Sequence, residues 1–528
     1  MKIMNLIATK NSKGHWPGLN KLTRLRMSLL SVSLLLACQI ATAQKKENGS
    51  VDAEHQMIQV QEKGAGIVHT LHPDAQWYPD AGLGLFIHWG LSSVRNIDAS
   101  WPMIPGWGLM DKKLDSAQIA MVVREKHYNI YNDRPLLTPN EYWSSAKVFN
   151  PQHYDPEKWI KAAKEAGFTY VVLTTRHHEG FAMWPSNFGD FNTKNYMGGK
   201  DLVKAFIAAC RKYGMKVGLY YSPPDWYFDR DYKNFLLGSA AKNNPGLPAL
   251  DADLNPITRQ HTAQEIAQHK AAYAAMIRDQ ILELISNYGK IDLLWFDGTA
   301  AVDHPESVVT QAEIRKLQPG IVINPRMHGT GDFKTYERTP PTHDPGGIWA
   351  EFCNTWTNSW SNSSTVPFRS DAFILGQFVS MRAWGVNYLP SVGPTADGNF
   401  PDAVYQHMKV VADWMKINGP SVKNTKRLPA NESASVPATS SGDTRYLFAI
   451  PEFMKGGMYE QDKLPAKDTV LTLGGVAKPL FVKLMGTSQT LNFDYKNQQL
   501  SVYLPAGSRS SLVDVIEVKL PAADGKIK

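Results

Sequence analysis

Two carboxylates stand where the sequence could support nucleophilic and acid–base chemistry. Asp297 closes the apolar stretch IDLLWFDG (291–298), and Glu337 follows forty residues later in GDFKTYER (331–338), where we expect a loop. A strand-end aspartate beside Trp295 would be desolvated. Such a pair could serve as nucleophile and general acid/base in glycoside hydrolysis, with carboxyls ~5–5.5 Å apart in a retaining enzyme. The alternative is a capping aspartate and a solvated surface glutamate.

Other polar side chains follow the predicted strands and could bind a polar ligand. They are His88, His177, His178, Tyr220 and Arg326. Adjacent residues of a regular strand point to opposite faces, so His177 and His178 can share a site only if the strand ends there. The absence of a His-x-His pair disfavours a metal-dependent barrel hydrolase, and we predict neither a metal nor an organic cofactor.

Short apolar runs alternate with helical patterns over most of the chain. The runs span 82–90, 168–178, 215–222, 291–298 and 320–326, and helices are expected at 155–167 and 201–214. Near-continuous apolar strands separated by helices predict a parallel sheet covered by helices. No Gly-rich phosphate motif follows the first strand, and the polar residues gather at strand ends. We therefore predict an α/β fold with a (β/α)₈-like TIM barrel.

The pattern of apolar and polar residues changes near residue 430. Short alternating strands with Gly, Asn and Ser turns predict an all-β sandwich at 429–528, after a catalytic barrel at 76–428 and a polar segment at 44–75. Two insertions, at about 97–140 and 228–260, fit no barrel strand or helix. Insertions after barrel strands are expected near the rim of an active site.

The first 43 residues have the pattern of a cleaved secretory signal. A basic region is followed by the apolar MSLLSVSLLLAC (27–38), too short to span a bilayer, and by an A-x-A-like site at 41–43. We therefore expect an exported protein, periplasmic or secreted, without a transmembrane span. A lipoprotein signal acylated on Cys38 is the alternative.

Charge and cysteine content exclude other classes. Residues 1–43 hold six basic and no acidic side chains, so without them the formal charge falls from +7 to +1, which gives no case for a nucleic-acid partner. Apart from Cys38, only Cys210 and Cys353 are present. Neither a disulfide framework nor a Cys-rich metal site is therefore expected.

Six ordered motifs resemble glycoside hydrolase family 29, the retaining α-L-fucosidases. They are GLFIHWG, RHHEGFAMW, GLYYSPPDW, LLWFDG, GDFKTYE and SVGPTADG, and the resemblance runs from about residue 76 to 425. It implies a double displacement with Asp297 as nucleophile and Glu337 as acid/base. The substrate-binding residues that it implies are His88, Trp101, His177, His178, Tyr220, Trp295 and Arg326.

The chain departs from the family pattern at three places that bear on the substrate. Ser100-Trp101-Pro102 replaces Glu-Trp-Tyr, Ala350-Glu351-Phe352-Cys353 replaces Trp-Glu-x-Cys, and Trp360-Ser361-Asn362 replaces Trp-Gly-Tyr. An oligosaccharide or polysaccharide with terminal α-L-fucose remains the expected substrate. The alternatives are an α-L-galactosidase with the same carboxylates, tolerant of O6-sulfate as in red-algal galactans, and an inactive carbohydrate-binding protein. A homo-oligomer is possible.

Overall fold

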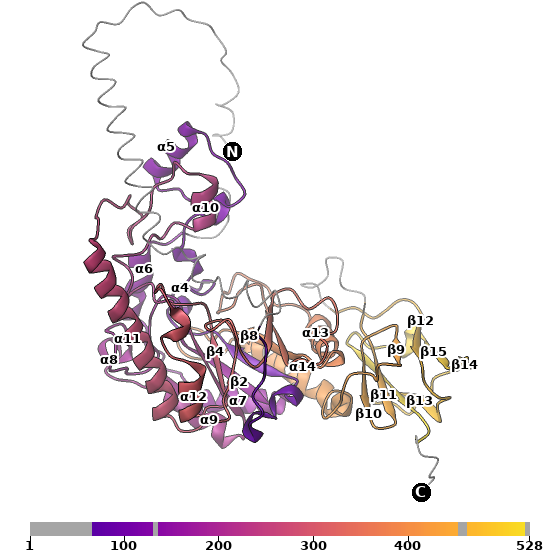
Figure 1. The fold of residues 1–528 in the computed structure, drawn as a ribbon. Helices are drawn as coiled ribbons and strands as arrows, with labels where there is room; N and C mark the ends of the chain where they lie inside the picture. The colour runs from indigo at the N-terminus through magenta and orange to yellow at the C-terminus, as the bar shows by residue number, and fades with distance from the viewer. Residues whose placement is uncertain (1–65, 130–135, 452–461, 523–528) are drawn as a thin grey trace, which may run out of the picture.

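The computed structural model describes residues 66–129, 136–451 and 462–522. A barrel of parallel strands lies beside a smaller antiparallel β-domain (Figure 1). The predicted α/β fold, a TIM-like barrel followed by a C-terminal β-sandwich, is thereby confirmed. The predicted signal at 1–43, with Cys38, lies outside the described residues.

The barrel sheet has eight parallel strands in the order β5-β4-β3-β2-β1-β8-β7-β6. Their bounds are β1 Gly84–Ile87, β2 Tyr170–Arg176, β3 Lys216–Tyr221, β4 Leu293–Phe296, β5 Val322–Ile323, β6 Lys334–Glu337, β7 Ala350–Thr355 and β8 Asn387–Val392. Every residue of β1, β2, β4, β7 and β8 is buried, as expected for strands covered on both faces. The five predicted strand runs contain β1 to β5.

Strands β5 and β6 stand at the two ends of this order. In the described chain no β-ladder joins them, and Asp332 connects them instead. The Asp332 backbone N–H donates to Ile323 O at 2.8 Å, and its carboxylate accepts from Ile323 N at 2.7 Å. Val68 N–H donates to Gly331 O beside them at 3.0 Å. The sheet therefore curls nearly into a closed barrel, and residues 66–75, which we assigned to the polar segment, contribute to its wall.

Most of the α-helices lie around the outside of the barrel, and two of them, in the predicted insertions, project from it (Figure 1). Their bounds are α4 Leu91–Arg95, α5 Ser116–Glu125, α6 Pro139–Trp143, α7 Pro156–Glu165, α8 Thr193–Tyr196, α9 Leu202–Lys212, α10 Gly238–Asn243, α11 Ala263–Asn287, α12 Gln311–Leu317, α13 Asp371–Ala383 and α14 Asp402–Asn418. Helix α7 is preceded by Asp155, whose carboxylate caps two backbone N–H groups, and it buries Trp159, Ile160 and Ala163 on one face. Both predicted helices, at 155–167 and 201–214, are present as α7 and α9.

The interior of the barrel is filled by aromatic side chains below the strand ends. Gly84 on β1 makes room for one of them, because a Cβ there would lie 2.1 Å from the Tyr170 ring. Tyr170 in turn donates to the buried Glu351 at 2.6 Å. This packed layer forms a floor on which the site described below rests.

The C-terminal domain consists of two four-stranded antiparallel sheets, β10-β11-β16-β13 and β14-β15-β12-β9. The strands are β9 Ser433–Ala434, β10 Ala438–Ser441, β11 Thr444–Ala449, β12 Thr469–Gly474, β13 Phe481–Leu484, β14 Phe493–Lys496, β15 Gln499–Leu504 and β16 Asp514–Lys519. Alternate residues, such as Leu471 and Leu473, form its own apolar core. The domain contacts the barrel at α14, where Trp414 Nε1 donates to Val513 O at 2.8 Å.

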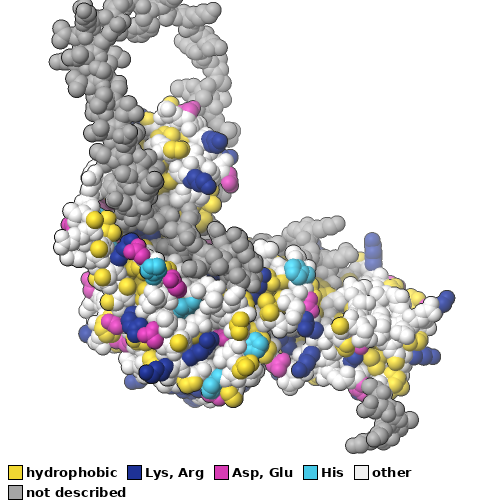
Figure 2. All heavy atoms as spheres, viewed as in Figure 1, with side chains coloured by type: hydrophobic (Ala, Val, Ile, Leu, Met, Phe, Trp, Pro, Cys, Tyr) yellow, Lys and Arg dark blue, Asp and Glu magenta, His cyan; other side chains and the backbone are white. Residues whose placement is uncertain are grey.

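The two predicted insertions pack against each other and project from the barrel with α5 and α10 (Figure 1). Leu237 N–H donates to Pro105 O at 3.0 Å, and Leu114 N–H to the Asn244 side chain at 2.8 Å. Basic and acidic side chains are mixed on the face shown in Figure 2, so charge does not mark a functional face there. Within 66–129, 136–451 and 462–522, none of the helices has the length and hydropathy required of a membrane span.

Candidate active site

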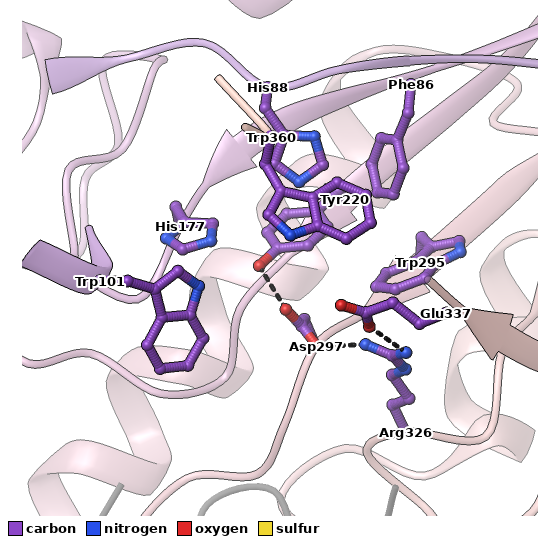
Figure 3. Close-up of a pocket in the computed structure, with 10 residues that line it drawn as sticks. All are labelled: Phe86, His88, Trp101, His177, Tyr220, Trp295, Asp297, Arg326, Glu337 and Trp360. Atoms are coloured by element: carbon purple, nitrogen blue, oxygen red, sulfur yellow. Dashed lines mark hydrogen bonds and ion pairs between the residues drawn. The ribbon is translucent and has the colours of Figure 1, made fainter. Parts of the chain in front are cut away.

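A pocket of about 240 Å³ opens at the carboxyl ends of the barrel strands (Figure 3). Its lining residues are Phe86, His88, Trp101, His177, Tyr220, Trp295, Asp297, Arg326, Glu337 and Trp360. Eight of the nine predicted site residues are in this lining, and the ninth, His178, is fully buried behind it. Side chains from distant parts of the chain therefore meet where TIM barrels carry their active sites.

The two carboxylates reach the pocket from the ends of two strands. Asp297 directly follows β4, and its N–H donates to Tyr221 O at 3.2 Å. Glu337 is the last residue of β6, which pairs with β7, so the prediction of a loop at 331–338 is wrong for this residue. The short β6 is only partly buried, which hides it from a pattern of apolar residues. Its strand position fixes the backbone of Glu337.

Arg326 bridges the two carboxylates. Its Nη1 donates to Asp297 Oδ1 at 2.8 Å, and its Nη2 donates to Glu337 Oε2 at 2.5 Å. Burial alone would lower the pKa of Arg326, but the Glu337 and Asp297 carboxylates raise it above the usual value, so the guanidinium stays charged. Both guanidinium ends are thus engaged with carboxylates, whereas the sequence predicted that Arg326 would bind sugar hydroxyls.

Asp297 receives a second hydrogen bond on its other oxygen. Tyr220 OH donates to Asp297 Oδ2 at 2.8 Å and also lies 2.7 Å from Ser222 Oγ. Burial, together with the Asp297 carboxylate, raises the pKa of Tyr220 well above its usual value, so the hydroxyl keeps its proton. His178 Nε2 lies 3.5 Å from the same oxygen. Asp297 is therefore held by donors on both oxygens.

His88 is fixed by a serine from β8. Its Nδ1 lies 2.8 Å from Ser391 Oγ, and that hydroxyl donates to Trp360 O at 3.1 Å. Because the serine proton is used on Trp360, Ser391 accepts from a protonated Nδ1. Burial, with a further contribution from His177, holds the pKa of His88 well below its usual range. His88 is therefore neutral and presents an unprotonated Nε2, which can accept a hydrogen bond.

His177 and His178 lie side by side, with ring centroids 4.3 Å apart. Strand β2 ends at Arg176, so strand alternation does not apply to them and both rings can reach the site. His177 Nδ1 lies 2.8 Å from Ser100 Oγ. Ser100 stands where the family pattern has a glutamate, and here its hydroxyl orients a pocket imidazole.

Aromatic rings form the remaining walls. Trp295 stacks on Tyr220 at 5.6 Å, and Phe86 meets Trp295 edge to face at 5.1 Å. Trp101 lies against His178 at 5.2 Å. Phe86 was not predicted, although it precedes His88 by two positions on β1 and so shares its face, which was a usable signal. The pocket thus combines polar atoms with an apolar corner, as small-molecule sites do.

Trp360 comes from a loop after β7 and also escaped prediction as a site residue. Its backbone N–H donates to Asp98 Oδ1 at 2.7 Å, and the Arg338 guanidinium lies 5.0 Å from its ring centroid. Asp98 therefore holds the Trp360 loop and is not among the pocket-lining residues. No local spacing links Trp360 to the other walls; the usable signal was its place in the family pattern, where Trp360-Ser361-Asn362 replaces Trp-Gly-Tyr.

A third carboxylate, Glu351, lies beneath the pocket in the barrel interior. It accepts hydrogen bonds from Trp295 Nε1 at 2.9 Å, Tyr170 OH at 2.6 Å and Tyr78 OH at 3.1 Å. Burial raises its pKa to about 7, although the three donors and Arg326 oppose the shift. Glu351 therefore fixes the Trp295 wall from below.

Among the described residues, His177, His178 and Asp297 form the group that could hold a metal ion. One nitrogen or oxygen atom from each lies within 4.8 Å of the others. However, the two Asp297 oxygens already accept from Arg326 and Tyr220, both at 2.8 Å, and the guanidinium charge opposes a divalent cation. These side chains fit hydrogen bonding to an uncharged ligand better than metal binding.

The comparisons with known proteins found alpha-L-fucosidases by family model, by sequence and by structure. The family model described as alpha-L-fucosidase matches residues 53–420. The tissue alpha-L-fucosidase of Bos taurus is 25% identical over 431 residues, 77% of this chain and 81% of that protein. The tissue alpha-L-fucosidase of Homo sapiens is 25% identical over 426 residues, 76% and 81% of the two chains.

Solved structures show a similar fold. Alpha-L-fucosidase isoenzyme 1 from Paenibacillus thiaminolyticus superposes with a TM-score of 0.64 and 24% identity, covering 85% of this chain and 99% of that one. The Thermotoga maritima alpha-fucosidase in complex with fucose gives a TM-score of 0.60 and 22% identity, covering 84% and 96%. At 24% and 22% identity, this structural similarity is evidence for the fold alone.

Proposed function

Because the chain belongs to the α-L-fucosidase family, we propose that it is an exo-acting, retaining glycosidase that releases terminal α-L-fucose from glycans. Asp297 is the proposed nucleophile and Glu337 the proposed acid/base. His88, His177 and Tyr220 are proposed to contact the sugar hydroxyls. In the same proposal His178 and Arg326 hold Asp297, and the indoles of Trp101 and Trp295 are walls for the sugar ring.

One observation carries this proposal: a single guanidinium contacts both carboxylates. Two carboxylates on the two Nη atoms of Arg326 are close together, as a retaining glycosidase requires for attack and protonation at one bond. Their depths also differ, since the Asp297 side chain is 14% exposed and the Glu337 side chain 35%. A nucleophile deep in a pocket and an acid nearer its mouth suit removal of a terminal sugar.

The proposed reaction is a double displacement. An Asp297 oxygen attacks the anomeric carbon, the bond to the leaving-group oxygen breaks, and Glu337 gives its proton to that oxygen. Glu337 then takes a proton from water, the water oxygen attacks the same carbon, and Asp297 leaves as a carboxylate. Because Oε2 of Glu337 accepts from Arg326, Oε1 is the oxygen left to carry the proton. The Tyr220 and Arg326 donors stabilise the Asp297 carboxylate on its release.

In the proposed complex the C5 methyl group of fucose lies against Phe86 and Trp295, which supports fucose over L-galactose as the substrate. Phe86 and Trp295 form an apolar corner, and the indole N–H of Trp295 is already used on Glu351. A methyl group fits such a corner without loss, whereas a hydroxymethyl group would lose its water partners there. Because the two sugars differ by this one hydroxyl, the apolar corner supports α-L-fucosidase activity, with α-L-galactosidase activity as the competing outcome.

The test is hydrolysis of p-nitrophenyl α-L-fucoside and p-nitrophenyl α-L-galactoside by the purified protein. We expect the fucoside to be cleaved with the higher kcat/KM, and Asp297→Asn to lower that value by roughly a thousandfold or more, about 4 kcal/mol. Asp303→Asn is the matched control, since Asp303 is 76% exposed and lies outside the pocket. Full activity in Asp297→Asn would refute the assignment, and binding without hydrolysis would identify a carbohydrate-binding protein.

The stereochemistry and the metal question have separate tests. Proton NMR of the first-formed product should show retained anomeric configuration, and inversion would refute the double displacement. Treatment with EDTA should leave the rate unchanged. A loss of activity that added Zn²⁺ or Mg²⁺ restores would instead favour a metal-dependent hydrolase.

Export is proposed from the sequence alone, because residues 1–43 lie outside the described residues. The basic region, short apolar run and A-x-A-like site support a secretory signal. Mass spectrometry of the mature protein should find an N-terminus at Gln44. A lipid-modified N-terminal Cys38 would show the lipoprotein alternative to be correct.

A further inference from the structure

A buried carboxylate, one oxygen of which accepts no hydrogen bond among the described residues, lies beside His177 in the pocket wall. Glu179 follows His178 in the loop after β2, and its side chain is 5% exposed. Among the described residues, its Oε2 is buried and accepts no hydrogen bond. His177 Nδ1, which can carry a compensating proton, lies 3.4 Å from this oxygen. Buried carboxylates nearly always have hydrogen-bond partners, so this one requires an explanation.

Within the described part of the chain, the other groups recorded as interacting with Glu179 carry no positive charge. The nearby carboxylate of Asp225 is paired with Arg176 at 3.0 Å, and the Glu179 charge helps burial to raise the pKa of Asp225. Burial, followed by the Glu179 charge, also raises the pKa of Tyr142 well above its usual value. Arg176 is committed to Asp225 and to backbone carbonyls. Among the described contacts of Glu179, His177 is therefore the group that can balance its charge.

An ionised Glu179 facing a neutral His177 would be a buried charge without a counter-ion, a strongly unfavourable state. We propose that Glu179 is a positioning residue that shares one extra proton with His177, so that the pair is neutral overall. The proton lies either on the imidazole, which gives an imidazolium–carboxylate pair, or on Glu179, whose O–H then donates to Nδ1. In both forms His177 Nε2 carries a hydrogen.

This inference deepens the proposed function, on which it rests, by assigning opposite hydrogen-bonding roles to two pocket histidines. His88 presents a bare Nε2 because its Nδ1–H is used on Ser391. His177, with Nδ1 turned to Ser100 and Glu179, presents an Nε2–H. The substrate is therefore a sugar with one hydroxyl that donates to His88 and an oxygen that accepts from His177.

The first experiment reads the proton directly and needs no substrate. In protein labelled with ¹⁵N-histidine, the His177 signals are those missing from the spectrum of His177→Asn. We expect a protonated Nε2 in the wild type, and loss of that fixed state in Glu179→Met, which fills similar space without a charge. A bare Nε2 in the wild type would overturn the proposal, whether or not the protein hydrolyses fucosides.

The second experiment uses the kinetics of p-nitrophenyl α-L-fucoside. Glu179→Met should raise KM by roughly 10- to 100-fold, the loss expected for a hydrogen bond from a charge-assisted donor, while kcat changes by less than about threefold. Glu179→Asp should recover part of the KM, and Glu157→Gln on the surface of α7 is the control. An unchanged KM in Glu179→Met would overturn the proposal. So would a loss of kcat together with a lower melting temperature in Glu179→Met that Glu179→Asp does not restore. Failure of the wild type to cleave the fucoside would count against the proposed function alone.

Discussion

Replacement of Glu351 by glutamine should change how the stability of the barrel depends on pH. Glu351 is fully buried, and its pKa is raised from 4.5 to about 7, chiefly by burial. Below pH ~4.5 the residue is protonated in both the folded and unfolded states. As the pH rises through 7, the unfolded chain has already released the proton that the folded protein retains. The stability that protonated Glu351 gives the folded state at low pH is therefore lost as the pH rises through 7.

The size of the effect follows from the shift. A shift of 2.5 units, from 4.5 to about 7, corresponds to ~3.4 kcal/mol, of which about 2.5 kcal/mol falls between pH 5 and 8.5. A barrel of ~350 residues has an unfolding entropy of roughly 0.7 kcal/mol/K, so this free energy corresponds to a change of roughly 3–4 °C in melting temperature.

Glutamine preserves the local hydrogen bonds and removes only the titration. Trp295 Nε1 can only donate, so the amide oxygen must face it. The amide NH₂ then faces the hydroxyls of Tyr78 and Tyr170, which can accept as well as donate. Any cost of the substitution should therefore be nearly independent of pH.

The assay is thermal unfolding of the wild type and Glu351→Gln between pH 5 and 8.5. We expect the melting temperature of the variant, relative to the wild type, to rise by roughly 3–4 °C across this range. Glu313→Gln is the control, because hydrogen bonds from Arg278 and Thr310 lower the pKa of Glu313 to about 2, so its charge is constant over these pH values. A difference between Glu351→Gln and wild type that stays flat with pH would refute the reasoning.

Two further substitutions test the contacts of the carboxylate pair. Arg326→Met should lower kcat/KM by at least about 100-fold and should lower the melting temperature. The reason is that removing one partner of a buried ion pair costs about 3–5 kcal/mol. Arg326→Lys should recover only part of the loss. Kinetics and thermal unfolding that match the wild type would contradict the bridging role. Tyr220→Phe removes the hydroxyl 2.8 Å from Asp297 Oδ2 and should lower kcat/KM by roughly 10- to 100-fold in the fucoside assay. Unchanged activity would show that Asp297 does not depend on this donor.

Much of the barrel could be predicted from local pattern. The apolar runs that became β2 and β4 are fully buried, and the amphipathic patterns that became α7 and α9 begin at capping aspartates. Strand β6 escaped because its four residues are only partly buried, and so Glu337 was expected in a loop. Strand β6 is defined by its pairing with β7, and its four residues show too little alternation of apolar and polar side chains to be predicted from the sequence.

The sequence by itself determined the strand-and-helix alternation, the polar residues that end the strands and the candidate carboxylates, because each depends on neighbours along the chain. Only the tertiary structure decided what those residues contact. Arg326 meets Asp297 and Glu337 across 29 and 11 positions, and His88 meets Ser391 across 303. Such contacts arise when strands distant in sequence are brought to one end of a barrel, and no local pattern encodes the partner. That closure turned Arg326 from an expected sugar ligand into the bridge between the carboxylates, and left Glu179 with His177 as its partner.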